Sequence, residues 1–245
     1  MKSIFCILLL IASFSSAFAV VKSPIEAAIA NPSRPADDRN ADERRHPREL
    51  LQFSQIKAGD TVVDVLPGKG YFTRLFISLV GPQGHVIAYV PKEIENAPFK
   101  PVDYAKKAVE GAKNAEAKVT PLPEAPAENV DVIWTSQNYH DLHIKSFIKA
   151  DVAAYNKVLF KMLKPGGHLI IVDHVAPAGS GEAEIEKLHR IDPKMVRQEV
   201  EAAGFVFEAE SKTLQRNEDH KLNVFDPAIR GKTDQFAFRF VKPKK

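Results

Sequence analysis

The sequence predicts an α/β fold, in which a largely parallel sheet is covered by helices, and three observations predict it. Short apolar segments of strand length alternate with amphipathic helical segments over residues 57–245. The 245 residues, of which 44% are hydrophobic, suffice to bury one sizeable core. Only one cysteine is present, Cys6, so a packed core rather than a set of disulfides must hold the fold.

Residues 1–19 predict a secretory signal peptide. Lys2 precedes an apolar run over residues 4–11, and Ala17 and Ala19 form a small-x-small cleavage pattern. The run is shorter than the roughly 20 residues that cross a bilayer. We therefore expect an exported protein, periplasmic or secreted, with no stable membrane span after cleavage; the alternative is an uncleaved anchor.

The charge of the chain is nearly balanced, with 34 basic and 31 acidic side chains and a net charge of +3. Apart from the lysines at the carboxyl end, the basic residues form no long block. Nucleic acid is therefore not an expected partner.

The segment 20–56 is predicted to be a helical extension before the main domain at 57–245. Residues 20–47 are polar and broken by four prolines, which favours short helices on the surface of the domain. Residues 48–56 predict one further short helix.

The first half of the domain alternates strand and helix. Strands are predicted at 61–65 and 85–89, separated by a helix over 71–80 whose apolar residues recur at helical spacing. A weakly amphipathic helix at 103–114 and a short strand at 118–122 follow.

The second half continues the pattern with strands at 130–135 and 168–173 around a helix at 150–163. Asp192 and Pro193 predict a helix start, as N-cap and first helical residue, and Gly204 predicts its C-cap. The last two strands are predicted at 205–214 and 235–242, where three phenylalanines alternate with other residues.

Three segments, 62–71, 130–142 and 163–169, resemble the glycine-rich loop, the fourth strand and the turn before the fifth strand of class I S-adenosylmethionine-dependent methyltransferases. The sequence Tyr-His-Asp-Leu at 139–142 and the segment 225–234 resemble a group of exported predicted methyltransferases. The resemblance implies a Rossmann-like sandwich with a mostly parallel seven-stranded sheet, helices on both faces and short N-terminal helices. It also implies S-adenosylmethionine as cofactor and methyl transfer to a small molecule.

By position, the resemblance assigns cofactor contacts to Asp64, which orders the loop, and to the loop itself. The expected cofactor-binding residues are Asp64, Leu66, Pro67, Gly68, Lys69, Gly70, Tyr71, Glu93 and Asn138. Two departures matter. Leu66 replaces the family's first glycine, and the second strand ends without the family's ribose-binding carboxylate, leaving Glu93 as the next acidic residue.

The densest polar cluster follows the predicted fourth strand, at the edge where the methyl group lies in this fold. His140 is the candidate base, since a histidine pKa near 6.5 suits proton transfer, with Asp141 as its orienting partner or a second base. His174, after Asp173 at the end of the fifth strand, is the third candidate catalytic residue. The alternative is a polar turn in which Asp141 caps a helix; His143 is expected at the surface.

Two other functions stay open. The exported chain could keep the fold only to bind a small molecule, because S-adenosylmethionine is made in the cytosol and its charge hinders passage through a membrane. His140, Asp141, Asp173 and His174 would suit metal-assisted hydrolysis, but no short ligand spacing supports it and no metal ligand is assigned.

Expectations also follow for residues outside these motifs. His189 and Arg190 are expected either to line the substrate side of the cleft or to form structural ion pairs. Arg230 and Asp234 are expected either to set specificity or to pin their loop by a salt bridge. Trp134 is expected in the core.

Overall fold

The computed structural model describes residues 23–148, 150–218 and 220–244, so the predicted signal peptide lies outside the described residues. The described chain forms one seven-stranded sheet in the order β3-β2-β1-β4-β5-β7-β6. All neighbours are parallel except β7, which is antiparallel to both β5 and β6. The strands are β1 (Thr61–Val65), β2 (His85–Pro91), β3 (Ala115–Thr120), β4 (Val130–Ser136), β5 (Leu163–His174), β6 (Val206–Ser211) and β7 (Gln235–Val241). The predicted fold class is confirmed.

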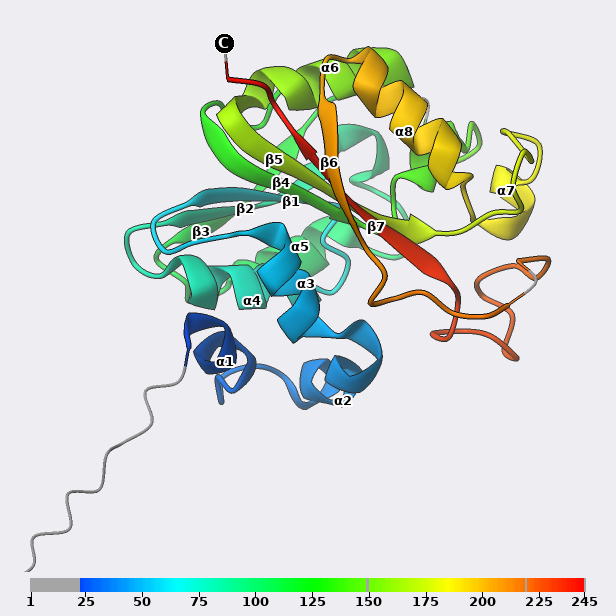
Figure 1. Cartoon of the computed structure of the whole chain (residues 1–245). Coiled ribbons are helices and arrows are strands. Elements are labelled where there is room, and N and C mark those ends of the chain that lie inside the picture. Colours follow the sequence, from blue (N-terminus) through cyan, green and yellow to red (C-terminus); the bar gives the residue numbers. More distant parts are fainter. Residues whose placement is uncertain (1–22, 149, 219, 245) are drawn as a thin grey trace, which may run out of the picture.

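Helices cover both faces of the sheet (Figure 1). The helices are α1 (Pro24–Ile29), α2 (Ala36–Arg45), α3 (Pro47–Ser54), α4 (Tyr71–Val80), α5 (Pro101–Val109), α6 (Val152–Met162), α7 (Ile185–Leu188) and α8 (Pro193–Ala202), with short 3-10 turns at Lys92–Ile94 and His140–His143. In Figure 1, α6 and α8 lie above the sheet, and α3, α4 and α5 lie below it.

The alternation of side chains along the strands explains this two-faced core, because successive residues of a strand point to opposite faces. Val63 of β1 packs in the cluster that contains Leu159 of α6 and Val200 of α8. Its neighbour Val62 packs in the cluster that contains Phe76 of α4 and Trp134. Both faces of the central strands are therefore buried, as parallel strands require.

The three N-terminal helices are part of the second cluster. Leu50 and Leu51 of α3 and Ala28 of α1 are buried there together with residues of α4. The described part of the extension, residues 23–56, thus shares a core with the domain, and it brings charged side chains of α2 next to the start of α4.

Several element bounds differ from those predicted. The helix at 71–80 is confirmed, but α5 spans 101–109, and β3 spans 115–120 because it pairs with β2 from Ala115 onward. β5 begins at Leu163, which pairs with Val130 before an irregularity in the register. Asp192 caps α8 as predicted, whereas the C-cap is Ala203 and Gly204 follows it with φ +107°.

The strand order places β1 between β2 and β4, so the chain reverses its direction of winding at β1. Ligands of open α/β sheets bind at the carboxyl ends of the strands at this point. No helix in the described part of the chain is both long enough and apolar enough to cross a membrane.

Candidate active site

A cavity of about 580 Å³ lies at the carboxyl ends of β1, β4 and β5, within the range of roughly 300–1,000 Å³ that is usual for small-molecule sites. Its lining comes from the loop after β1, the segment after β4, the end of β5, and residues brought in from outside the sheet. The lining residues are Arg45, Asp64, Leu66, Pro67, Gly68, Lys69, Tyr71, Phe72, Phe99, Ser136, Gln137, Asn138, His140, Asp141, Phe147, His174, His189, Val224 and Phe225.

Leu66 keeps the backbone path that a glycine would take. Its φ is +53°, a left-handed conformation that costs a residue with a side chain roughly 1–2 kcal/mol. Its N–H donates to the Tyr89 carbonyl (2.9 Å), and its carbonyl accepts from the Asn138 amide (2.9 Å). The side chain packs between two core clusters. Asn138 therefore ties the loop to the end of β4, and Leu66 takes the left-handed conformation that a glycine adopts without strain.

The two remaining loop glycines have different roles. A Cβ on Gly68 would meet nothing within 4 Å, so this residue lines open space in the cavity. A Cβ on Gly70 would lie 2.2 Å from the Ala108 Cβ of α5. Gly70 does not line the cavity; it permits α4 and α5 to approach closely.

Asp64 joins the end of β1 to the first turn of α4. The Thr73 hydroxyl donates to its carboxylate at 2.6 Å. The carboxylate is buried, and burial raises the pKa of Asp64 to about 7, against the opposing effect of the Thr73 hydrogen bond. It lines the floor of the cavity next to the loop.

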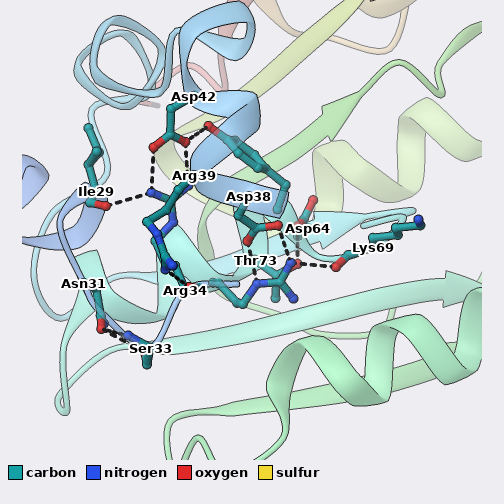
Figure 2. A network of polar contacts seen from close by, with 12 residues as sticks. Ile29, Asn31, Ser33, Arg34, Asp38, Arg39, Asp42, Asp64, Lys69 and Thr73 are labelled. Atoms are coloured by element: carbon teal, nitrogen blue, oxygen red, sulfur yellow. Dashed lines mark hydrogen bonds and ion pairs between the residues drawn. The ribbon is translucent and has the colours of Figure 1, made fainter. Parts of the chain in front are cut away.

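A polar network that includes side chains of α2 holds the loop after β1 in place (Figure 2). The Arg74 guanidinium donates to Asp38 at 2.7 Å and to the Lys69 carbonyl at 2.8 Å. The Tyr71 hydroxyl donates to Asp42 at 2.6 Å. The N-terminal extension therefore fixes both the loop and the start of α4.

Arg45 is a cavity residue that the sequence analysis missed. It is the last residue of α2, and its guanidinium lies 4.7 Å from the centre of the Tyr71 ring. Its Nε atom is buried without a hydrogen-bond partner among the described residues. Burial is the main cause that lowers the pKa of Arg45, and the positive charge of the nearby Arg44 lowers it further. No motif signalled it, because its place depends on how α2 packs.

Glu93 does not line the cavity. Its carboxylate accepts a hydrogen bond from the Leu122 backbone N–H at 2.8 Å and holds the loop after β3. Contrary to the expectation, Glu93 is not positioned to contact a cofactor in the cavity. The neighbouring wall of the cavity is formed instead by Phe99 and Phe147, whose ring centres are 5.7 Å apart.

His140 is held by a fully buried carboxylate. Asp173 accepts from the His140 ring Nδ1 (2.8 Å) and from the backbone N–H of His140 (2.8 Å) and of His174 (2.8 Å). Burial would lower the pKa of His140, but the charge and hydrogen bond of Asp173 raise it overall. Burial would likewise raise the pKa of Asp173, and His140 lowers it overall. The two form a buried, hydrogen-bonded imidazole–carboxylate pair.

His174 is brought to the same edge but is engaged differently. Its Nδ1 lies 2.8 Å from the Thr233 hydroxyl, and burial lowers its pKa to about 3. A neutral imidazole in this place can accept or donate a hydrogen bond but carries no charge.

Asp141 and His189 complete the polar end of the cavity. The Asp141 Oδ1 lies 3.3 Å from His140 Nε2 and 3.9 Å from His189 Nδ1. Burial raises the pKa of Asp141 to about 6, against the effect of His140. Burial and then the His140 charge lower the pKa of His189. The structure thus places all three predicted catalytic residues on the cavity. His189 also lines it, which was one of the two expectations for this residue.

Contacts in the structure decide between the expectations for the remaining residues. The side chain of His143 is only 4% exposed and bonds Glu199, so the expectation of a surface residue is wrong. The alternative of a structural ion pair holds for Arg190, which pairs with Glu218 at 2.8 Å. Asp234 pairs with His220, Arg230 lies over the Phe225 ring, and Trp134 is buried in the core.

A family model described as a methyltransferase domain matches residues 56–226. The ubiquinone/menaquinone biosynthesis C-methyltransferase of Pseudomonas paraeruginosa is 29% identical over 141 residues, which are 54% of this chain and 49% of the relative. The enzyme of that name from Teredinibacter turnerae is 27% identical over 140 residues, 53% and 49% of the two chains. The chain therefore spans about half the length of the curated relatives it matches.

Solved structures show the same fold. A SAM-dependent methyltransferase from Aquifex aeolicus aligns with a TM-score of 0.59 at 20% identity, covering 85% of this chain and 98% of its own. Geranyl diphosphate C-methyltransferase from Streptomyces coelicolor, solved with S-adenosyl-L-homocysteine, aligns with a TM-score of 0.55 at 12% identity, covering 88% and 87%. The family match, the strand order and the loop after β1 agree: the chain belongs to the methyltransferase-domain family, with the class I fold of S-adenosylmethionine-dependent methyltransferases.

Proposed function

We propose that this protein methylates a small, largely apolar acceptor, with S-adenosylmethionine as methyl donor. One observation carries the proposal: a single cavity joins the loop at 66–70 to the polar pair His140 and Asp141. Donor and acceptor sites in one enclosed space are what direct methyl transfer requires.

The residues on the donor side fit this cofactor. Open space beside Gly68 admits a ligand against the backbone, and Arg45, which lines the same cavity, offers a guanidinium to a carboxylate. Asp64, Gly68 and Arg45 would hold the cofactor, which supplies an electrophilic methyl group when bound. Arg45 is the residue that we assign to its carboxylate, because it is a cavity-lining residue whose planar guanidinium matches the geometry of a carboxylate.

The acceptor side is apolar apart from its histidine end. Phe99 and Phe147 form one wall, and Val224 with Phe225 forms another. Phe225 is 57% exposed, which places an apolar surface at the cavity mouth. Such walls suit a hydrophobic acceptor. The names of the curated relatives support carbon as the accepting atom.

The polar end supplies the groups that an acceptor must meet when it loses a proton. Asp173 fixes the ring of His140 through Nδ1, which leaves Nε2 toward Asp141 and the cavity. His140 and Asp141 would orient the acceptor and take up its proton, and His174 with Thr233 would offer a neutral hydrogen bond beside them.

We further propose that the protein acts after export, in the periplasm or outside the cell. The support is the signal pattern of residues 1–19. Mass spectrometry of the protein purified from its producing cells tests this: a chain that begins at Val20 is expected. A chain that retains Met1 and is recovered with the cytosolic fraction would contradict export.

Calorimetric titration of the full chain with S-adenosylhomocysteine tests the donor site. A micromolar dissociation constant, about −8 kcal/mol, is expected. Gly68→Val should abolish the heat, since it fills the space beside the loop, whereas Gly111→Val, at a positive φ with nothing nearby, is the matched control. No heat and no thermal shift at millimolar ligand would overturn the proposal.

A further inference from the structure

Three potential ligand atoms converge at the acceptor end of the cavity. His140, Asp141 and His189 each offer one atom, and these atoms lie within 4.8 Å of one another. Asp141 Oδ1 is 3.3 Å from His140 Nε2 and 3.9 Å from His189 Nδ1. In the described part of the chain this is the one group of histidine, cysteine and acidic side chains with that geometry.

The two separations from Asp141 are close to those that a small divalent ion needs between its ligands. Bonds of about 2.0–2.2 Å from a metal to nitrogen and oxygen put neighbouring ligands roughly 3.0–3.5 Å apart. The His140–Asp141 separation lies in that range, and the His189 separation exceeds it by a few tenths of an ångström. A small rotation of the His189 side chain would close the set around one ion.

The orientation of His140 is that of a ligand. Metal-binding histidines usually donate their second ring N–H to a carboxylate, which fixes the ring and its tautomer. Asp173 has this relation to His140, with Nδ1 at 2.8 Å, and it is itself held by two backbone N–H groups. Only Nε2 remains available, and it lies on the side of Asp141.

His189 is held in place by backbone and ring contacts rather than by a hydrogen bond to Asp141, because 3.9 Å is too long for one. It ends α7 with φ +52°, a conformation that costs a non-glycine residue roughly 1–3 kcal/mol and that recurs at binding sites. Its ring packs edge-on against Phe225 and His140, with centres at 5.0 and 5.5 Å.

We propose that His140, Asp141 and His189 bind one divalent transition-metal ion that accepts imidazole and carboxylate ligands, such as Zn²⁺ or Co²⁺. Two histidines and one carboxylate leave further coordination positions open, and here these face the cavity. With the ion bound, His140 and Asp141 would act as its ligands and not as proton acceptors. If the proposed function holds, the ion would then take an oxygen of the acceptor and lower its pKa. The site then selects acceptors with a hydroxyl or carbonyl group next to the methylated atom.

The test uses the purified full chain, stripped with a chelator and titrated with Co²⁺ and with Zn²⁺ in the absence of other ligands. One equivalent of Co²⁺ should bind saturably and give visible absorption bands, with Zn²⁺ displacing it. His189→Gln should weaken the affinity at least tenfold, while it leaves the His140–Asp173 pair intact. His143→Gln is the matched control, because His143 lies on the 3-10 turn that begins at His140 but its ring faces Glu199.

The site is refuted if Co²⁺ gives no saturable one-equivalent binding. It is also refuted if His189→Gln, folded by circular dichroism, binds Co²⁺ as tightly as the wild type, or if His143→Gln loses binding equally. Titration with S-adenosylhomocysteine is run separately on the same samples. If the protein binds Co²⁺ but not S-adenosylhomocysteine, the proposed function alone is overturned. If it binds S-adenosylhomocysteine but not Co²⁺, the ion site alone is overturned.

Discussion

Replacing Gly70 by alanine should destabilise the fold far more than replacing Gly68, although the two residues share one loop. Both have positive φ, +79° and +54°, so an alanine at either position carries a left-handed strain of roughly 1–2 kcal/mol. Only at Gly70 does the new Cβ also collide, 2.2 Å from the Ala108 Cβ. Overpacking of this kind costs about 1–3 kcal/mol. We expect losses of about 1–2 kcal/mol for Gly68→Ala and of about 2–5 kcal/mol for Gly70→Ala.

Urea unfolding followed by the fluorescence of Trp134, the single tryptophan and fully buried, measures these losses. Gly111→Ala is the control for strain alone, since Gly111 has φ +76° with nothing near its Cβ and lies outside the cavity. Calorimetry with S-adenosylhomocysteine supplies the second measurement. Gly68→Ala should lose affinity while it unfolds like Gly111→Ala.

Equal stabilities of Gly68→Ala and Gly70→Ala would refute the close approach of α4 and α5 as the reason for Gly70. A Gly70→Ala variant of normal stability that loses only ligand affinity would place Gly70 on the cavity instead. Either result would require a different packing of this loop.

Three further predictions concern the same cavity. Burial raises the pKa of Asp64 to about 7 against about 3.9 in the unfolded chain, so the neutral form is favoured in the fold and stability falls as pH rises from about 4 to 7. Asp64→Asn should therefore become more stable relative to the wild type over that interval, by up to roughly 4 kcal/mol in urea unfolding; parallel pH profiles would contradict this. Leu66→Gly should be more stable than Leu66→Ala by about 1 kcal/mol, because both lose the packing and only alanine keeps the strain at φ +53°; thermal unfolding showing the reverse order would refute the strain. Arg45→Met should weaken S-adenosylhomocysteine binding about 10- to 100-fold without loss of thermal stability, because it removes a charged donor that has a buried, partnerless Nε; unchanged calorimetric affinity would exclude Arg45 from the site.

Local patterns determined the architecture. The apolar spacing of residues 71–80 was sufficient to place α4, and the alternating phenylalanines were sufficient to place β7. These signals are strong because the apolar residues recur at the spacing of a helix or a strand. The buried face of each element can therefore be read from its own sequence. The order of the elements and the glycine-rich loop then implied the sheet and its ligand-binding edge.

Pairing partners decided where the weaker elements begin and end. β3 is half-exposed and has no apolar period of its own, so hydrogen bonding to β2 set its bounds at 115–120. β5 extends back to Leu163 for the same reason, through its pairing with Val130.

The chemistry of the site was only partly readable from the sequence. His140, Asp141 and His174 follow the ends of adjacent strands, and the parallel sheet alone brings such residues together. Arg45 ends a helix far away in the sequence, and His189 follows the end of α7. Glu93 turns to Leu122 instead of the cavity. A strand order fixes which strand ends meet, whereas the direction of a loop or helix-end side chain depends on every neighbour it packs against, and that information exists only in the tertiary structure.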